Sequence, residues 1–162
     1  MKILCTIAAL ACGLALAAAP ALASDRAIPF EVRLADRAVT CADSDLFGIP
    51  FDLVSLGGKP LGTGQSCVHS IVGCDPLVPF CHQTVDATFT LAFAFARGTV
   101  TAPMTLHEVL PTESLTLQRG EGRISSGTGA FARARGSVEG GGFFEFTATG
   151  VSSALFYVVR LK

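Results

Sequence analysis

Apolar and polar residues alternate with a period of two through most of the chain after residue 24, and this pattern restricts the possible folds. Within "TFTLAFAF", the residues Phe89, Leu91, Phe93 and Phe95 fall on one face, with Thr and Ala on the other. The same alternation recurs in three other stretches: 31–39, 99–109 and 151–161. Turn sequences rich in Gly and Pro separate these stretches, and no long helical period with caps is present. The sequence therefore predicts an all-β domain of about eight strands, arranged as a sandwich or a closed barrel.

The first 23 residues have the features of a signal peptide. Lys2 provides a positive start, an Ala- and Leu-rich apolar run follows, and Ala21-Leu-Ala23 forms an A-x-A cleavage site. An uncleaved membrane anchor is the alternative, but Pro20 and the weak hydrophobicity of alanine disfavour it. We therefore expect residues 1–23 to be removed near Ala23/Ser24, with residues 24–162 secreted or periplasmic and without an integral membrane segment.

The charge of the remaining chain narrows the range of partners. Without Lys2 it carries 11 basic and 13 acidic residues, a net charge of −2. This balance, with no basic block, indicates neither a nucleic-acid partner nor a polybasic membrane contact. Its 139 residues (24–162) are enough for one domain with a core.

Four cysteines follow the signal segment: Cys41, Cys67, Cys74 and Cys81. An even number in an exported chain predicts two disulfides, and four cysteines allow three pairings. Because Cys67 and Cys81 flank one loop between two apparent strands, the favoured pairing is Cys67–Cys81 with Cys41–Cys74. Zinc is the alternative, because His69 and His82 lie beside cysteines. The cysteine spacing matches no finger pattern and an oxidising compartment favours disulfides, so we expect no metal.

Residues 122–142, "GRISSGTGAFARARGSVEGGG", contain seven glycines and include a G-x-G-x-x-A match that begins at Gly127. A dinucleotide-binding turn needs a strand before this motif and a helix after it. Gly136 and the later glycines leave no room for such a helix. The stretch is better interpreted as turns and bulges in a curved sheet, and we expect no cofactor.

The same stretch resembles the signature I-x-G-G-T-G-x-[FY]-x-x-A-R-G of the allene oxide cyclase barrel-like and dirigent families. "FDLVSLGGKPLGTGQSCV" resembles the early hairpin of that group, and "TFTLAFAFARGTVTAP" resembles its following strand-turn-strand. The resemblance covers roughly residues 51–138 and departs at Ser126, where a glycine is usual. It implies a single eight-stranded antiparallel β-barrel with a central cavity.

The resemblance transfers to site residues only in part. Plant allene oxide cyclases use an Asn-bound water, and this chain contains no Asn. Dirigent proteins use cavity acids and an Arg near the glycine signature, and Arg135 matches that Arg. Ala130 stands where pathway-type dirigents carry an acid, so the resemblance implies no acid at that position.

Alternation independently places polar residues on apolar faces. Glu108 is in phase with Met104 and Leu106, Asp36 with Val32, and Tyr157 with Leu155. We predict Glu108 and Arg135 as catalytic candidates, with Glu108 pointing into the barrel and Arg135 as its partner. The predicted ligand-binding residues are these: Asp36, Phe93, Met104 and Tyr157.

Each of these residues also has a structural interpretation that stays open. In that interpretation Glu108 lies past the end of a strand, and Asp36 lies at a bulge. Tyr157 is a core residue with a hydrogen-bonded hydroxyl, and Arg135 stabilises the glycine turn through backbone carbonyls.

Three functions are compatible with these features. The first is a barrel that binds a small apolar or phenolic molecule without chemistry of its own. The second is a cofactor-free isomerase or cyclase, or a dirigent-like guide, that uses one acid. The third is a structural or interaction protein whose barrel is filled by its own side chains, including 12 Phe. An empty apolar pocket would favour the first two functions.

Overall fold

The computed structural model describes residues 26–73 and 80–162. They form nine strands and two short 3₁₀ helices. In chain order these are β1 (Arg26–Leu34), β2 (Phe47–Val54), β3 (Pro60–Gly73), β4 (Cys81–Phe93), η1 (Ala94–Ala96), β5 (Gly98–Leu110), β6 (Leu115–Arg123), β7 (Ser126–Gly127), η2 (Gly129–Phe131), β8 (Gly136–Thr147) and β9 (Gly150–Leu161).

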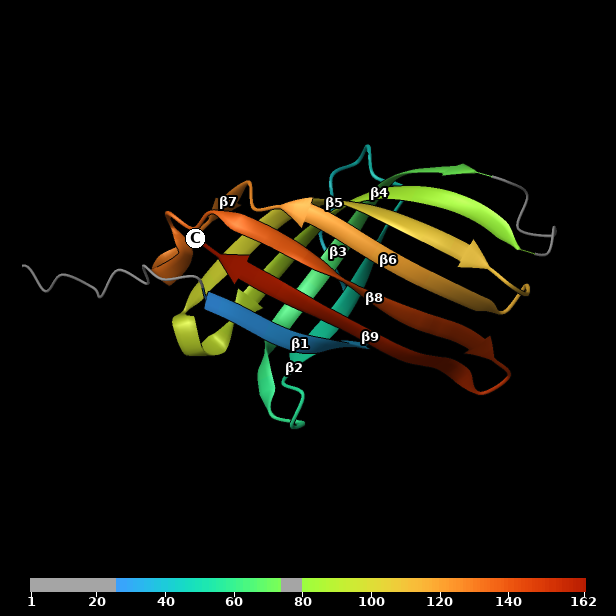
Figure 1. The fold of residues 1–162 in the computed structure, drawn as a ribbon, viewed down its shortest axis with the longest axis horizontal. Helices are drawn as coiled ribbons and strands as arrows, with labels where there is room; N and C mark the ends of the chain where they lie inside the picture. Colours follow the sequence, from blue (N-terminus) through green and yellow to red (C-terminus); the bar gives the residue numbers. More distant parts are fainter. Residues whose placement is uncertain (1–25, 74–79) are drawn as a thin grey trace, which may run out of the picture.

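Eight of the strands close into one antiparallel barrel (Figure 1). The order around the barrel is β4-β3-β2-β1-β9-β8-β6-β5, and pairing between β4 and β5 completes the ring. The two-residue β7 pairs with β5 beyond the end of β6. The predicted eight-stranded antiparallel barrel is therefore confirmed, with one additional short strand.

Alternation in the sequence determines which face of each strand is buried. In β5, the side chains of Val100, Ala102, Met104, Leu106 and Glu108 are buried, and the residues between them face outward. Strand β4 pairs with β5 along its entire length and shows the same pattern. Inward side chains from all eight barrel strands therefore form one interior.

The two ends of the barrel differ. Both 3₁₀ helices and the C-terminus lie at one end, called here the closed end (Figure 1). Phe131 of η2 is 1% exposed there, and its ring lies 5.5 Å from that of Phe93. Phe93 also contacts Phe30 edge-on. Large aromatic side chains thus fill the closed end, which leaves the opposite end, the open end, for a cavity.

The glycine-rich segment belongs to the closed end. Gly127 is in β7, and Gly129 begins η2 with a φ of 55°. A Cβ on Gly129 would lie 2.1 Å from the backbone oxygen of Arg97, so this close approach needs glycine. The three-residue η2 is far shorter than a dinucleotide-binding helix, as the sequence predicted.

Two details of the strand pattern differ from expectation. Strand β1 ends at Leu34, so the predicted continuation through Asp36 and Ala38 is absent and both residues are exposed in the following loop. Phe95 falls in η1, after β4 has ended, and is half exposed. In both places the chain turns before the apolar alternation in the sequence stops.

The disulfide pairing was predicted incorrectly. Cys41 is bonded to Cys67, which excludes Cys67–Cys81 and Cys41–Cys74. Cys67 lies on β3, and the loop after β1 folds back onto this strand and brings Cys41 beside it. Cys81 also belongs to a disulfide, while Cys74 lies outside the described residues.

The predicted signal segment, residues 1–23, also lies outside the described residues. Within the described part of the chain, no helix is long and apolar enough to cross a membrane.

Candidate functional site

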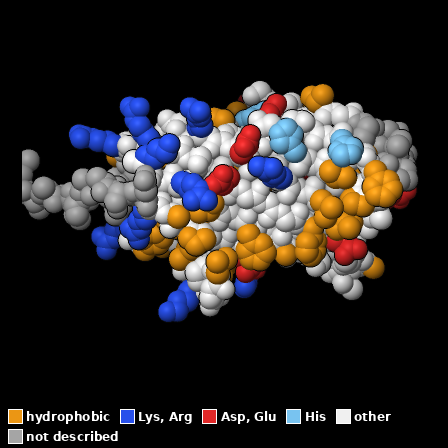
Figure 2. Space-filling view, in the orientation of Figure 1, with side chains coloured by type: hydrophobic (Ala, Val, Ile, Leu, Met, Phe, Trp, Pro, Cys, Tyr) orange, Lys and Arg blue, Asp and Glu red, His pale blue; other side chains and the backbone are white. Residues whose placement is uncertain are grey.

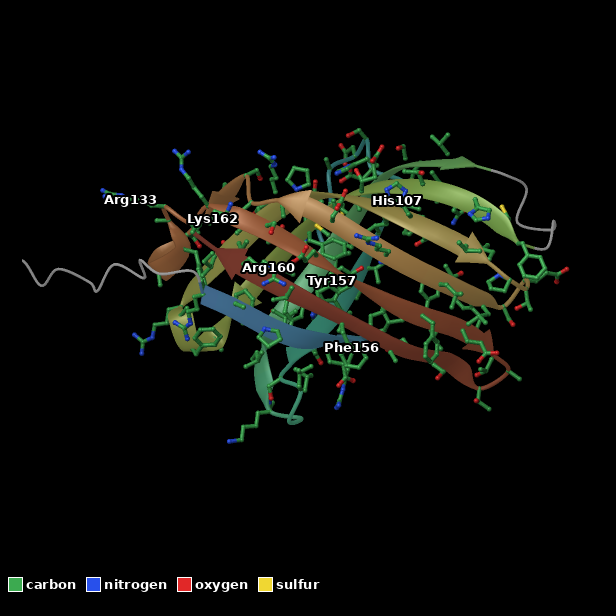
Figure 3. All side chains as sticks on the ribbon, viewed as in Figure 1. His107, Arg133, Phe156, Tyr157, Arg160 and Lys162 are labelled. Atoms are coloured by element: carbon green, nitrogen blue, oxygen red, sulfur yellow. A yellow bond between two sulfur atoms is a disulfide. The ribbon has the colours of Figure 1, made fainter. Side chains whose placement is uncertain are left out.

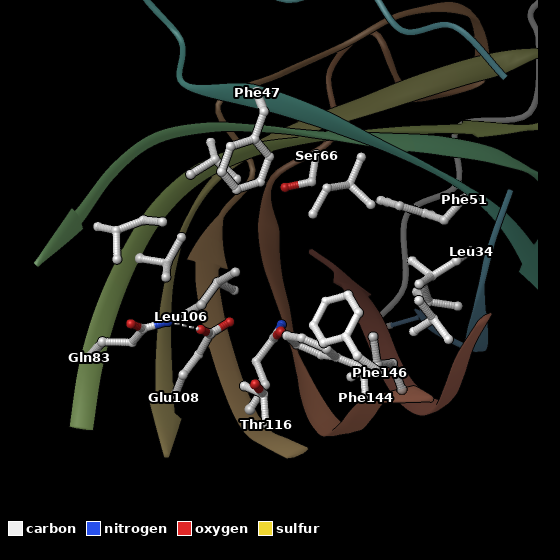
Figure 4. Close-up of a pocket in the computed structure, with 18 of the residues that line it drawn as sticks. Leu34, Phe47, Phe51, Ser66, Gln83, Leu106, Glu108, Thr116, Phe144 and Phe146 are labelled. Carbon is white, nitrogen blue, oxygen red and sulfur yellow. Dashed lines mark hydrogen bonds between the residues drawn. The ribbon is translucent and has the colours of Figure 1, made fainter. Parts of the chain in front are cut away.

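A cavity of about 500 Å³ occupies the open end of the barrel. All eight barrel strands contribute to its wall, which Figure 4 shows in close-up. Fifteen of its 22 lining residues are aliphatic or phenylalanine. The barrel interior is therefore filled by its own side chains at one end only.

The cavity opens to solvent through an apolar rim. Phe47, Phe146 and Val151 line the cavity and are 47%, 59% and 44% exposed. On the face drawn in Figure 2, hydrophobic side chains form a band along the lower edge that reaches the open end, whereas most Lys and Arg side chains lie toward the closed end. An apolar molecule could therefore pass from the rim into the cavity along apolar surface.

Glu108 is the acidic side chain buried in the cavity wall. It lies on the inward face of β5 and is 7% exposed. Its partner is Gln83 on β4, whose Nε2 donates a 2.6 Å hydrogen bond to Glu108 Oε2 (Figure 4). No ion pair within residues 26–73 and 80–162 involves Glu108.

This environment favours the neutral acid. Burial raises the pKa of the Glu108 carboxyl, and the hydrogen bond from Gln83 lowers it by a smaller amount. Glu108 thus retains its proton to a higher pH than an exposed glutamate. A protonated carboxyl both donates and accepts hydrogen bonds, so it suits a neutral polar group on a ligand.

Tyr157 provides a second polar group deeper in the cavity. It is 3% exposed, and Figure 3 shows its ring within the barrel. The side-chain amide of Gln118 on β6 donates a hydrogen bond to the Tyr157 hydroxyl oxygen. Burial raises the pKa of Tyr157, so this phenol is neutral across the ordinary pH range. The phenol keeps its own hydrogen for a further acceptor.

Aromatic rings surround Tyr157. Its ring stacks on Phe30 with centroids 6.2 Å apart, and Phe89 meets it edge-on at 5.5 Å. Phe89 in turn contacts Phe51, and both line the cavity. These contacts fix the position of the phenol and make the floor of the cavity aromatic.

Of the predicted site residues, the cavity brings together Glu108 and Tyr157. Met104 and Phe93 are buried but lie outside the cavity wall. Met104 lies nearer the closed end on β5, and Phe93 ends β4 in the packed aromatic cluster. Both side chains face inward as predicted, but they lie in the packed part of the interior near the closed end.

Asp36 and Arg135 are not part of the cavity. Asp36 is exposed because β1 ends two residues earlier. Arg135 is exposed just before β8, and its backbone oxygen accepts a 2.8 Å hydrogen bond from the Lys162 amide at the closed end. Figure 3 shows Lys162 at that end. The predicted pairing of Glu108 with Arg135 is therefore wrong, because the two residues belong to opposite ends.

Sequence reasoning missed Gln83 and Gln118. Gln83 is in phase with the buried residues Val85 and Phe89 on β4, so extending the alternation upstream from "TFTLAFAF" would have placed it inside. Gln118 shares its face with the buried Thr116 on β6, a strand whose alternation is weaker.

No family model, no curated protein and no solved structure matches this chain. The class of the protein is therefore given by its fold and its cavity alone. The protein is a closed antiparallel β-barrel with one packed end and one apolar cavity that contains a buried acid and a buried phenol.

Proposed function

We propose that this protein is an exported barrel that binds one small, mostly apolar or phenolic molecule in the cavity at its open end. The observation that carries this proposal is the cavity, whose volume of about 500 Å³ falls within the range of small-molecule sites. Such sites combine an apolar lining with a few convergent polar groups, and Glu108, Gln118 and Tyr157 supply these groups here.

The polar groups indicate the chemistry of the ligand. Glu108 in its neutral form and the Tyr157 hydroxyl both offer hydrogen atoms to an acceptor, and neither supplies a positive charge. A hydroxyl, ether or carbonyl group on an otherwise apolar skeleton fits these donors. Aromatic skeletons gain further contact with Phe51 and Phe89.

The proposal includes membership of the allene oxide cyclase barrel-like and dirigent group. The glycine-rich stretch that carries the resemblance forms tight turns at the closed end, which is a structural use of those glycines. Export is supported by the Cys41–Cys67 disulfide together with the features of residues 1–23.

A binding titration with a blocking variant tests the proposal. The neutral fluorophore N-phenyl-1-naphthylamine should brighten and saturate at one site on the wild-type protein. Val85→Trp places a large ring in the cavity and should weaken this binding at least tenfold, that is by about 1.4 kcal/mol. Thr84→Trp is the matched control, because the neighbouring residue on β4 points to the opposite face. Equal binding by both variants would place the fluorophore outside the cavity and count against the proposal.

A second candidate is a cofactor-free isomerase or cyclase that uses Glu108 as its proton donor. The raised pKa of this buried carboxyl favours it, since general acids work best when they hold a proton near the working pH. Glu108→Gln separates the two functions. An enzyme loses turnover while it still binds substrate, whereas a binding protein shows a change in affinity alone.

A further inference from the structure

The loop between β1 and β2, residues 35–46, packs on the outer face of the barrel, away from the cavity. Gly48 on β2 makes room for it. A Cβ at Gly48 would lie 2.2 Å from Val39 Cγ2 and 2.8 Å from Cys41 Sγ. The missing side chain therefore lets the loop rest against the sheet, where it meets the outward residues of β3.

Four zinc-binding side chains converge at this contact. Cys41 Sγ, Cys67 Sγ and a carboxylate oxygen of Asp45 all lie within 4.8 Å of one another. His69 Nδ1 lies 2.5 Å from Asp45 Oδ1. Cys67 points outward from β3, and His69, at the irregularity between Val68 and Ser70, reaches Asp45 of the loop and Thr88 of β4. We name Cys41, Asp45, Cys67 and His69 the loop–strand cluster.

In the oxidised protein the loop–strand cluster is more compact than a tetrahedral zinc site at two places, the bond between the two sulfur atoms and the contact between His69 and Asp45. Zinc–ligand distances of about 2.0–2.3 Å place neighbouring donor atoms roughly 3.3–3.8 Å apart. The Asp45 and His69 donors would move apart by less than about 1 Å from their present 2.5 Å. The side chain of Asp45 is 5% exposed and that of His69 is 43% exposed, so a metal there would be shielded from water on the Asp45 side only.

Contacts other than the disulfide hold the loop in place. The Leu46 amide donates to Val68 O at 2.7 Å, and Gln65 Nε2 donates to Thr40 O at 3.0 Å. Asp45 is fixed within its turn, because its Oδ2 accepts a 2.8 Å hydrogen bond from the Ala42 amide. Opening the disulfide would therefore leave the four donors near one another.

Outer partners orient two of the donors. His69 Nε2 lies 2.7 Å from Thr88 Oγ1 on β4, which fixes the plane of the imidazole ring. Gln65 Nε2 lies 3.7 Å from Cys67 Sγ and directs an N–H toward the sulfur. Hydrogen bonds of this kind to ligand side chains are usual around metal sites and stabilise them.

We propose that the loop–strand cluster is a redox-controlled zinc site, closed by the Cys41–Cys67 disulfide and opened when a dithiol reduces that bond. The dithiol supplies two electrons and two protons and leaves as a cyclic disulfide, which gives the thiols of Cys41 and Cys67. One Zn²⁺ then displaces the two thiol protons to solvent, and neutral His69 binds the ion through Nδ1 while it carries its hydrogen on Nε2, beside Thr88 Oγ1. Oxidation reverses these steps and releases the ion. This site is independent of the cavity and of its ligand.

The experiment measures zinc affinity in both redox states of the protein lacking residues 1–23, by competition with a chromophoric chelator. The protein treated with a phosphine reductant should bind one equivalent of Zn²⁺, and the oxidised protein should bind at least about tenfold more weakly. Co²⁺ should give thiolate charge-transfer absorption in the reduced protein. Equal affinity in both states would overturn the proposal.

Two variants locate the ion. His69→Gln in the reduced protein should weaken zinc binding by about tenfold or more. His82→Gln, beside Cys81, is the matched control and should leave the affinity unchanged. The opposite result would assign the ion to the other cysteines and overturn the proposal. Circular dichroism accompanies each titration. A reduced protein that stays folded, or that refolds when zinc is added, supports the site. A reduced protein that stays unfolded in the presence of zinc contradicts it.

Discussion

Gln83 and Glu108 stand opposite each other on β4 and β5, and their side chains are joined by a 2.6 Å hydrogen bond inside the cavity. Gln83 donates, so the bond is strongest when Glu108 is ionised, and it opposes the effect of burial on the pKa of Glu108. The balance between these two effects determines whether the cavity presents a neutral acid or a charge.

The first prediction follows from that balance. Gln83→Met keeps the side-chain length and removes the donor, so the pKa of Glu108 should rise further above its ordinary value. Carboxyl ¹³C titration by NMR measures it directly. Gln118→Met is the control, because Gln118 donates to Tyr157 and not to Glu108. A pKa of Glu108 that falls in Gln83→Met would show that the hydrogen bond does not stabilise the carboxylate.

The second prediction concerns the dependence of stability on pH. The pKa of Glu108 is raised in the folded state, so its folded form holds the proton more tightly than the unfolded chain does. Relative to Glu108→Gln, the wild type should be most stable below about pH 4, the ordinary range of a glutamate pKa. It should lose this advantage as pH rises through the raised pKa, by about 1.4 kcal/mol per unit of pKa difference.

Thermal unfolding of wild type and Glu108→Gln between pH 4 and 8 measures this difference. Glu113→Gln, an exposed residue at the rim, should follow the wild-type profile. Parallel profiles for wild type and Glu108→Gln would contradict a buried environment that raises the pKa of Glu108.

The third prediction compares Gly129, whose backbone conformation requires glycine, with Gly57, where a side chain has room. Gly129→Ala should lower the free energy of unfolding by about 1–3 kcal/mol, because its φ is 55° and the new Cβ would meet the Arg97 oxygen at 2.1 Å. Gly57→Ala is the control, since its Cβ would meet only Ser55 Oγ, at 3.9 Å. Chemical denaturation of both variants measures the difference, and equal losses would disprove the assignment of η2 as a strained turn.

The fourth prediction concerns signal-peptide cleavage and the disulfide pairing. Intact mass should place the N-terminus at Ser24, and alkylation without reduction should label no cysteine in the denatured protein. Peptide mapping should recover Cys41 linked to Cys67. Their separation of 26 residues makes this bond worth about 3–4 kcal/mol of stability in the chain-entropy model. The double variant Cys41→Ala/Cys67→Ala should lose up to that amount, and recovery of a Cys67–Cys81 peptide would contradict the pairing.

Alternation predicted both the fold and the two central site residues, Glu108 and Tyr157, for the same reason. Strand β5 runs for 13 residues without a bulge, so the phase set by Val100 holds as far as Glu108. Tyr157 follows similarly from Leu155 and Val159 on β9. In a strand without a bulge, the alternation of inward and outward side chains continues unchanged over many residues. In a closed barrel, the inward face of each strand is buried.

Asp36 and Arg135 show where this reasoning stops. Alternation carries no information on where a strand ends, and β1 ends before Asp36. It also does not distinguish the two ends of a barrel, so an Arg at the closed end was assigned to an acid at the open end. The Cys41–Cys67 bond depends on how the loop after β1 folds onto β3, which is a tertiary contact that strand patterns do not encode.

Native mass spectrometry of the protein purified under native conditions from the cells and medium in which it is made tests the central claim most directly. The spectrum should contain a complex of one chain with one small, mostly apolar molecule that is released by organic solvent. The Val85→Trp variant, prepared in the same way, should lack the complex, and Thr84→Trp should retain it. A wild-type spectrum without any bound molecule, together with no saturable binding of the neutral fluorophore, would contradict a ligand-binding cavity.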